Sequence, residues 1–444
     1  MMRERFVIVG AGLTGGSAVV ALREEGFQGD LVLIGAEPEV PYERPPLSKE
    51  YLRGETTFED TLVRPPNFYA DNGIETHFGI WATKVDLDGK VVELEGGNRV
   101  PYDKVLITTG GRNRRPPLPG LDLEGVYDLR TVSDADRIRS QVAPGRKVVI
   151  AGMGFIGSEV AASLRMLGME VSVIARSRLP LDRVLGEQIA RVMESIHRDQ
   201  GVEMVFEDAV ETFEGSGRVE RVRTQDGRVI ACDFVVVGLG IEPITEVVAG
   251  SAIRIENGIV VDEYCRTSVE GVYAAGDVAN HYHPLFDRRI RVEHWQHAIK
   301  HGQAAARNML GNQKPYDEVY WFWSDQYTYN LQVCRVRHRL GRVDRTGKSG
   351  EAKVHRFLPE RWADPRHRWH EPREGRASVD GSDQSQDPGG PRPLARRGHP
   401  GARPGFGLAR GSGRRLPLLE SSTHVSPRRR KMNTHEATTW AFGS

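Results

Sequence analysis

Three glycines near the N-terminus, Gly10, Gly12 and Gly15, have the G-x-G-x-x-G spacing of a loop that cradles a diphosphate. The first glycine permits a tight turn, the second lets the phosphates approach the backbone, and the third lets a helix pack on the preceding strand. The runs 6–9 and 17–22 predict that strand and that helix, whose N-terminus offers free N–H groups to an anion. This context predicts a dinucleotide site.

The same pattern occurs a second time, where Gly152, Gly154 and Gly157 follow the apolar run 147–151. Every glycine that the motif requires is present. Two complete copies of the motif are far more specific evidence for dinucleotide binding than one copy. They predict that the chain binds two dinucleotides and transfers electrons between them.

The strand that follows each copy ends where the adenosine ribose of a dinucleotide lies. In the second copy, residues 170–175 end at an alanine, and Arg176 and Arg178 come next. Arginine pairs with a ribose 2′-phosphate, whereas an acidic residue here would bind the 2′-hydroxyl of NAD. The residues therefore favour NADPH, and the alternative is that both arginines are solvated on a loop.

Carboxylates follow two further predicted strands. After residues 30–35 come Ala36 and Glu37, and Glu37 is close enough to the strand end to bind a ribose hydroxyl. The strand 271–277 ends at Asp277, whose carboxylate either accepts hydrogen bonds from a polyol or caps a turn.

The segment 41–49 combines prolines with two basic residues, Arg44 and Lys49. Its prolines fix an extended turn from which a helix can start. We expect this turn to present Arg44 and Lys49 near the bound cofactor. The alternative is a rigid surface loop with solvated charges.

These motifs alternate with apolar strands and helices, which predicts an α/β protein of two or three domains in a chain of 444 residues. The formal net charge of +1 gives no reason to expect a nucleic-acid or membrane partner. No apolar run approaches the roughly 20 residues that span a bilayer. The chain enters a strand at once, leaving no room for a secretory signal, so we expect a cytoplasmic protein.

Cysteine and histidine spacing predicts no metal site. Cys232, Cys265 and Cys334 are far apart, which suits a reducing compartment and gives no disulfide framework. Five histidines lie between His281 and His301, without the spacing of a zinc site, and we expect surface or core positions for them.

Several motifs together resemble the FAD-dependent ferredoxin reductases of bacterial Rieske oxygenase and cytochrome P450 systems. The resemblance covers about residues 3 to 333. Its specific parts are the proline-rich segment and the Trp-Phe-Trp-Ser-Asp motif. The motifs, in chain order, are 10–15, 42–49, 152–157, 274–277 and 321–326.

This resemblance implies FAD in the first site and NADH in the second, with electrons leaving singly to a [2Fe–2S] ferredoxin. It implies that Lys49 lies beside the reactive end of the isoalloxazine and Glu159 near the nicotinamide. The residues that it implies around FAD are Thr14, Ala36, Arg44, Lys49, Ala82, Arg130, Asp277 and Trp295. The family usually has an acidic residue where Ala175 stands, so NADH and NADPH both stay open.

The implied fold is that of the pyridine nucleotide–disulfide oxidoreductases, with two Rossmann-like domains and a degraded C-terminal interface domain. We expect an FAD-binding domain in residues 1–118 and 245–318, and an NAD(P)H-binding domain in 119–244. The interface domain would begin in residues 319–334.

Residues 335–444 form a tail rich in Arg, Gly and Pro, where the family has strands over the flavin. We expect this tail to be disordered. A nucleic-acid-binding tail is an alternative, although regular aromatic or glycine repeats are missing. Our hypothesis is that a reading-frame shift near residue 334 replaced the original C-terminus. If the tail is genuine, we expect the ferredoxin-docking surface to be impaired.

The residues leave two alternatives to a ferredoxin reductase. A flavoprotein disulfide reductase or oxidase needs a redox cysteine near the flavin, and no cysteine precedes Cys232. The second alternative is a protein that keeps nucleotide binding but has lost ferredoxin docking.

Overall fold

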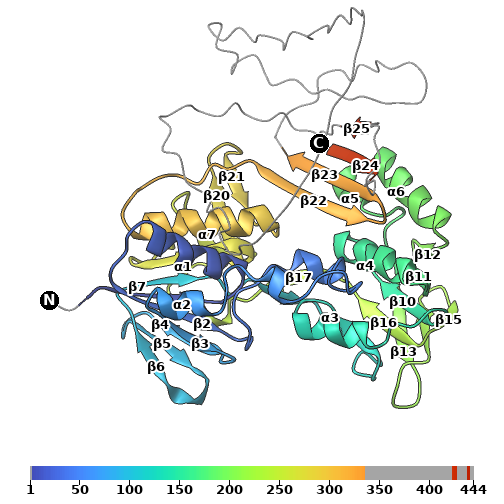
Figure 1. The fold of residues 1–444 in the computed structure, drawn as a ribbon, viewed down its shortest axis with the longest axis horizontal. Helices are drawn as coiled ribbons and strands as arrows, with labels where there is room; N and C mark the ends of the chain where they lie inside the picture. The colour runs from blue at the N-terminus through green and yellow to red at the C-terminus, as the bar shows by residue number, and fades with distance from the viewer. Residues whose placement is uncertain (1–2, 336–422, 428–437, 441–444) are drawn as a thin grey trace, which may run out of the picture. The chain divides into compact units, whose positions relative to one another are not determined.

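The computed structural model describes residues 3–335, 423–427 and 438–440, which all lie in one compact unit of the chain. Two parallel sheets form its framework (Figure 1). In each sheet, the strand before a glycine motif is central, and helices begin at the motifs. The predicted α/β fold with two dinucleotide-type domains is confirmed.

The first sheet has five parallel strands in the order β19-β7-β1-β2-β3. Phe6, Val7 and Ile8 of its central strand are all 0% exposed, because helices cover one face and smaller sheets the other. Helices α1 and α7 pack together on one face (Figure 1). The elements are β1 (Arg5–Val9), α1 (Leu13–Glu24), β2 (Asp30–Gly35), α2 (Asn67–Asp71), β3 (Ile74–Phe78), β7 (Lys104–Ile107), β19 (Val272–Ala274) and α7 (Trp295–Met309).

The second sheet repeats this arrangement with the strand order β12-β11-β10-β16-β9. Its apolar strands are also buried on both faces, as expected for a parallel sheet between covering layers. The elements are β9 (Val126–Asp128), α3 (Val132–Arg139), β10 (Lys147–Ala151), α4 (Phe155–Met166), β11 (Glu170–Ala175), α5 (Asp182–Leu185), α6 (Glu187–Asp199), β12 (Glu203–Phe206) and β16 (Phe234–Val237).

Smaller sheets and short 3-10 helices complete the two domains. The two chain crossings between the domains, at β8 and β17, pair with each other as an antiparallel ribbon. The remaining elements are β4 (Ala82–Asp86), β5 (Val91–Leu94), β6 (Arg99–Pro101), β8 (Gly111–Asn113), β13 (Val210–Glu214), β14 (Arg221–Thr224), β15 (Val229–Ala231), β17 (Ile241–Pro243), β18 (Ile259–Val261), β20 (Ala279–His283), β21 (Arg288–Ile290), η1 (Pro45–Ser48), η2 (Glu59–Thr61), η3 (Glu95–Gly97), η4 (Glu246–Val248) and η5 (Gly276–Val278).

A last antiparallel sheet consists of β22 (Tyr320–Gln326), β23 (Tyr329–Arg335), β24 (Thr423–Pro427) and β25 (Thr438–Trp440). Its first hairpin packs on α5 and α6 of the second domain through Phe322 and Leu331. Apart from residues 335, 423–427 and 438–440, the tail expected in 335–444 lies outside the described residues. The reading-frame hypothesis concerns this same part of the chain.

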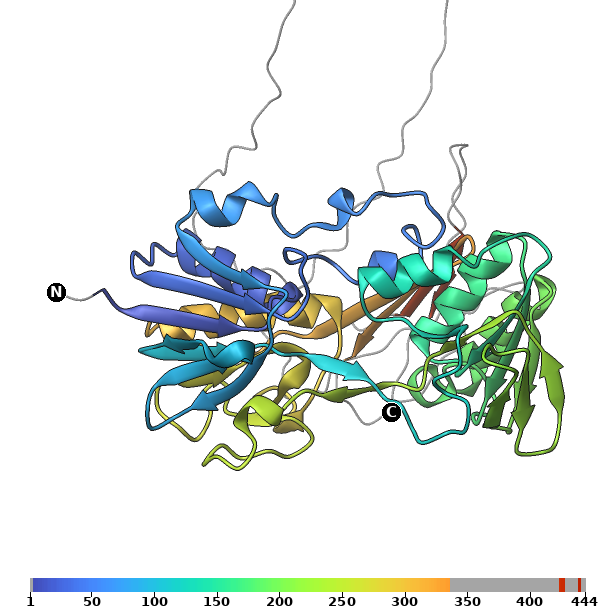
Figure 2. The same cartoon turned by 90° about the horizontal axis from the view of Figure 1, so that it is seen from below.

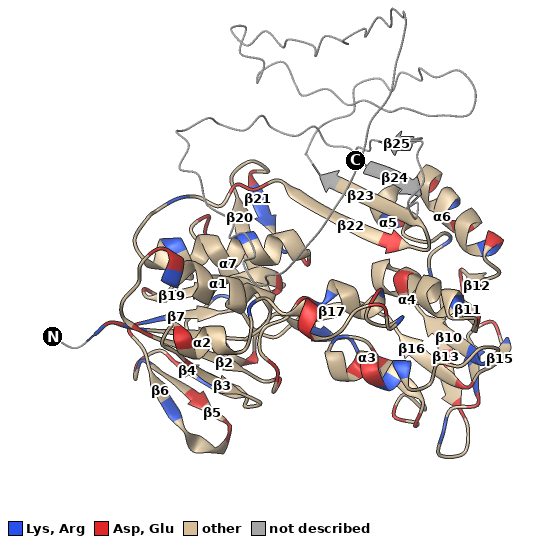
Figure 3. Ribbon diagram, in the orientation of Figure 1, with Lys and Arg blue, Asp and Glu red and all other residues tan. Residues whose placement is uncertain are grey.

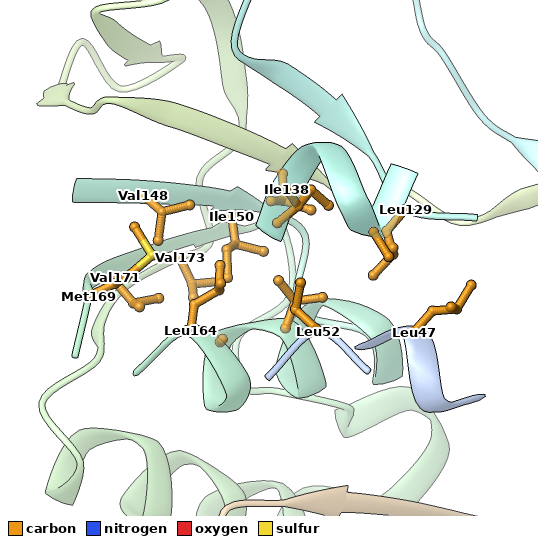
Figure 4. Close-up of a cluster of buried hydrophobic side chains, with 14 of the residues drawn as sticks. Leu47, Leu52, Leu129, Ile138, Val148, Ile150, Leu164, Met169, Val171 and Val173 are labelled. Atoms are coloured by element: carbon orange, nitrogen blue, oxygen red, sulfur yellow. The ribbon is translucent and has the colours of Figure 1, made fainter. Parts of the chain in front are cut away.

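The proline-rich segment of the first domain packs into the core of the second. Leu47 and Leu52 are 2% and 1% exposed and belong to the same buried cluster as Ile150 and Leu164. Figure 4 shows Leu52 near Leu164, and Leu47 at the side of the cluster near Leu129. Figure 2 shows this stretch running from the first sheet to the helices of the second domain. Burying two leucine side chains contributes about 1.5–3 kcal/mol each, which fixes the segment between the domains.

Acidic and basic residues are interspersed along the ribbon of both domains (Figure 3). This mixture agrees with the formal net charge of +1. Among the helices described, none combines the length and the apolar character needed to cross a membrane.

Candidate active site

The first glycine motif leaves open space at one position only. A Cβ at Gly10 would lie 2.3 Å from the carbonyl oxygen of Thr108, and one at Gly15 would lie 2.0 Å from that of Gly10. A Cβ at Gly12 would meet no atom within 4 Å. Gly12 is the N-cap of α1, so this empty space lies where free N–H groups attract phosphate. The motif therefore fits the diphosphate of a dinucleotide.

The second motif has the same geometry. A Cβ at Gly152 would lie 2.3 Å from the carbonyl oxygen of Gly238, and one at Gly157 would lie 2.1 Å from that of Gly152. Gly154, the N-cap of α4, again faces open space. The backbone at Gly154 and Gly12 is nearly identical, with φ of −78° and −77°. The chain thus holds two equivalent diphosphate cradles.

A cavity of about 1090 Å³ opens at the first cradle. This volume is slightly above the usual range for small-molecule sites, about 300–1,000 Å³. Gly15 lies outside its wall and packs α1 against the strand instead. The wall brings together all the other residues that the sequence placed around FAD: Gly10, Gly12, Thr14, Ala36, Glu37, Arg44, Lys49, Ala82, Arg130, Asp277 and Trp295.

Arg44 and Arg130 organise the polar side of this cavity. Arg44 donates to Glu37 Oε1 and to the carbonyl oxygen of Arg130, both at 2.5 Å. Tyr42 donates to the other oxygen of Glu37. Arg130 in turn donates to Asp277 Oδ2 at 3.1 Å. Both oxygens of Glu37 therefore accept hydrogen bonds that help to orient Arg44. From the sequence we expected Glu37 only to bind a ribose hydroxyl.

Lys49 and Glu159 form a buried ion pair in the cavity wall. Lys49 Nζ lies 2.8 Å from Glu159 Oε2, and each side chain is 4% exposed. Lys49 also donates to the carbonyl oxygen of Pro45 at 2.9 Å. Lys49 is therefore buried rather than solvated on a loop, which was the alternative for this segment.

Two serines complete the surroundings of Glu159, and sequence reasoning missed both. Ser48 donates to Glu159 Oε2 at 2.5 Å, and Ser324 donates to Glu159 Oε1 at 2.7 Å. Both serines occur in motifs that were recognised, 42–49 and 321–326. Nothing in those motifs indicates that the two serines meet at one carboxylate, since that depends on how the domains pack.

A second cavity, about 830 Å³, opens at the second cradle. It shares Phe155 and Arg115 with the first cavity, so the two cavities meet at the start of α4. Phe155 was not among the residues expected from the sequence. It precedes Glu159 by one helical turn, which places both on the same side of α4.

The two arginines expected to favour NADPH differ in their surroundings. Arg176 lines the second cavity and has no ion pair among the described residues. Arg178 instead pairs with Glu187 at 3.0 Å and does not line the cavity, because its side chain is drawn toward α6. Arg183, which the sequence did not single out, lines this cavity as well.

Three of the central histidines form a buried cluster. His281, His297 and His301 are all 0% exposed, with one ring nitrogen from each within 4.8 Å of the others. His301 Nδ1 accepts a hydrogen bond from the Gly276 N–H at 3.1 Å, which leaves Nε2 to carry the hydrogen of the neutral ring. Burial lowers the pKa of all three side chains, and the cluster is a neutral part of the core.

Residues 4–302 match the pyridine nucleotide-disulphide oxidoreductase family, and the chain belongs to this family. Within it, the chain groups with the ferredoxin reductases, as the sequence resemblance predicted. It is 39% identical to rhodocoxin reductase of Rhodococcus erythropolis, over 74% of this chain and 77% of that protein. It is 40% identical to a ferredoxin–NAD(P)+ reductase of a Sphingomonas species, over 74% and 80%.

Solved structures agree with these relatives. The reductase in the covalent putidaredoxin reductase–putidaredoxin complex superposes with a TM-score of 0.76 at 32% identity, over 80% of this chain and 88% of that one. The ferredoxin reductase of the CYP199A2 system from Rhodopseudomonas palustris gives 0.74 at 32% identity, over 79% and 89%. The chain is thus an oxidoreductase of a family that uses FAD and NAD(P)H.

Proposed function

We propose that this chain passes hydride from NADPH or NADH to FAD and passes single electrons on to a [2Fe–2S] ferredoxin, which supplies a Rieske oxygenase or a cytochrome P450. The observation that carries this proposal is the position of the Lys49–Glu159 pair. Both residues line the first cavity, and Phe155 on the same helix as Glu159 lines both cavities. Flavin and nicotinamide rings bound at the two cradles would meet here.

The first cavity fits FAD, which supplies the capacity to accept two electrons and release them one at a time. Gly10 and Gly12 would hold its diphosphate on the N-terminus of α1. Arg130 and Asp277, which bond to each other at 3.1 Å, would order the polar chain between diphosphate and ring. Thr14, Ala36, Arg44, Ala82 and Trp295 complete the wall.

Lys49 and Glu159 act at the junction of the cavities. Lys49 places its ammonium group in the wall of the first cavity with its side chain 4% exposed. A cationic group held away from water stabilises negative charge developing on a ring more strongly than it would in water. Glu159 fixes Lys49 and presents an oxygen that can orient the nicotinamide. Holding the two rings in register is the main contribution that a protein makes to hydride transfer.

Cys232 and Cys265, the two cysteines whose side chains the structure describes, argue against a disulfide reductase or a thiol-dependent oxidase. Cys232 and Cys265 are buried, and neither lines either cavity. Burial raises the pKa of Cys232 to about 12 and that of Cys265 well above its ordinary value. Thiols in this state are poor nucleophiles. Buried, unpaired cysteines also support the expected location in the reducing cytoplasm.

We also propose that the second cavity accepts NADPH. Gly152 and Gly154 would bind its diphosphate, and Arg176, which is free of ion pairs among the residues described, would meet the 2′-phosphate. Arg183 lies in the same wall and would add a second positive charge. Arg178 has no direct role in this proposal because it is engaged with Glu187.

The domain boundaries expected from the sequence also stay a proposal: residues 1–118 and 245–318 for FAD, 119–244 for NAD(P)H and 319–334 for the start of the interface domain. The crossings at β8 (Gly111–Asn113) and β17 (Ile241–Pro243) support them, since each lies within a few residues of a proposed boundary.

An anaerobic titration tests the proposed function. The purified protein should be yellow after reconstitution with FAD, and NADPH or NADH should bleach it. The bleached protein should then reduce a [2Fe–2S] ferredoxin from an oxygenase system. Absence of bound flavin after reconstitution would contradict the proposal. Bleaching without reduction of any ferredoxin tested would favour a reductase that has lost docking.

A further inference from the structure

A buried chain of hydrogen bonds ends at the Glu159 carboxylate. Ser324 on β22 donates to Glu159 Oε1 at 2.7 Å, although 165 residues separate them in the sequence. Ser324 is 0% exposed, and Glu159 is 3% exposed. Lys49 and Ser48 occupy the other oxygen, Oε2. Ser324 is thus the partner that fixes the side of the carboxylate facing away from Lys49.

The chain continues from Ser324 into the second domain. Gln326 Nε2 donates to Ser324 Oγ at 3.0 Å, and Gln326 Oε1 lies 2.9 Å from His197 Nε2 on α6. His197 Nδ1 lies 3.0 Å from the hydroxyl of Tyr327. Gln326 and His197 are 1% and 0% exposed, so water does not compete for these bonds.

One set of hydrogen positions satisfies every bond in this chain. Gln326 uses its amide N–H toward Ser324, so its oxygen must accept from His197 Nε2–H, and His197 Nδ1 then accepts from Tyr327. Every donor therefore points toward Glu159. The burial that lowers the pKa of His197 to about 4 keeps its ring neutral, as this tautomer requires. Hydrogen bonds aligned head to tail strengthen one another.

We propose that Ser324, oriented by Gln326 and His197, is a positioning residue that holds the Glu159 carboxylate in register with Lys49 and with the bound nicotinamide. This inference rests on the role proposed above for Lys49 and Glu159. It links the β22–β23 hairpin and helix α6 to the chemistry, since both elements supply members of the chain.

Replacing Ser324 by alanine tests this role, with Ser158→Ala as a matched control. Ser158 is the neighbour of Glu159 on α4 and is equally buried at 0%, but its hydroxyl has no hydrogen-bond partner in the structure described. For Ser324→Ala, we expect the limiting rate of flavin reduction to fall about ten- to a hundredfold, with an unchanged KM, because misplacing a reacting group costs up to about this much. Ser158→Ala should leave both constants unchanged.

A double-variant comparison separates this inference from the proposed function. If Ser324 acts through Glu159, Ser324→Ala should have no further effect in a Glu159→Gln background. A normal rate in Glu159→Gln alone would overturn the proposed role of Glu159. A slow Glu159→Gln combined with a normal Ser324→Ala would overturn only the positioning role. Gln326→Leu serves as a second variant that breaks the chain one step earlier.

Crystal structures of the variants provide a readout that does not depend on turnover. In Ser324→Ala, the Glu159 carboxylate should turn away from its present position while the α4 backbone stays in place. A carboxylate that keeps its position in both Ser324→Ala and Gln326→Leu would contradict the proposal. The same displacement in Ser158→Ala would also contradict it.

Discussion

Lys49 Nζ and Glu159 Oε2 lie 2.8 Å apart, although the two residues are 110 positions apart in the chain and belong to different domains. The pair is nearly inaccessible to solvent, with each side chain 4% exposed. It forms because Leu47 and Leu52 anchor the proline-rich segment in the core of the second domain. The ion pair and this apolar contact therefore depend on the same domain packing.

Breaking the pair from one side should destabilise the protein. Lys49→Met leaves a buried carboxylate without its counter-charge, which typically costs about 3–5 kcal/mol of unfolding free energy. We expect the lower end of this range, because Ser48 and Ser324 still donate to the carboxylate. Urea unfolding followed by circular dichroism measures the change.

The double variant Lys49→Met/Glu159→Gln provides the control for the ion pair. It removes both charges, so it should be more stable than Lys49→Met alone. If the loss of unfolding free energy in the double variant equals the sum of the losses in Lys49→Met and Glu159→Gln, the two charges do not interact in the folded protein.

The two glycine cradles should fail independently. Gly12→Val places a side chain in open space, without a clash in the protein, where the first diphosphate would lie. We expect this variant to fold but to retain little FAD. Gly154→Val is the matched substitution in the second cradle, at nearly the same backbone angles. It should keep FAD and raise the KM for the nicotinamide nucleotide.

Bound flavin is measured by the ratio of visible to ultraviolet absorbance, and KM by steady-state kinetics. Loss of FAD from both valine variants, or from neither, would show that the two cradles do not hold different dinucleotides.

Arg176→Glu should shift nucleotide preference toward NADH. A charge-assisted hydrogen bond contributes about 1.5–3 kcal/mol, so losing it should lower kcat/KM for NADPH by roughly ten- to a hundredfold. Arg178→Glu is the control, because Arg178 is paired with Glu187 and does not line the cavity. Equal shifts in the NADPH/NADH ratio for both variants would show that the 2′ position is not read by Arg176.

Stability should fall as the pH drops below the ordinary histidine pKa. Burial lowers the pKa of His301 from 6.5 to about 3. Below pH 6.5, His301 therefore binds a proton in the unfolded chain but not in the folded protein. The resulting loss of unfolding free energy grows until the pH nears the pKa of His301 in the folded protein. From about pH 7.5 to about pH 5, His301 should account for about 2 kcal/mol of lost unfolding free energy.

His301→Gln should remove this share of the pH dependence. Urea unfolding at both pH values compares the variant with the unaltered protein. An identical loss of unfolding free energy in the two proteins would show that His301 binds its proton equally well folded and unfolded.

The sequence by itself determined the parts of the site that depend on local conformation. The two diphosphate cradles could be predicted because each G-x-G-x-x-G motif is local. It spans one strand end, one turn and the start of one helix, and each glycine meets a steric requirement within that segment. The family resemblance likewise placed Lys49, Arg44 and Asp277 together, and they do line one cavity. The strands and helices around these motifs follow from apolar runs that need no distant partner to be recognised.

Only the tertiary structure decided which side chains meet across the domains. Arg176 and Arg178 look alike in sequence, but Glu187 on α6 engages one and leaves the other in the cavity wall. Ser324 reaches Glu159 only because β22 packs beside α4. Such contacts depend on how buried surfaces from distant segments fit together, and local patterns along the chain do not reveal which surfaces meet.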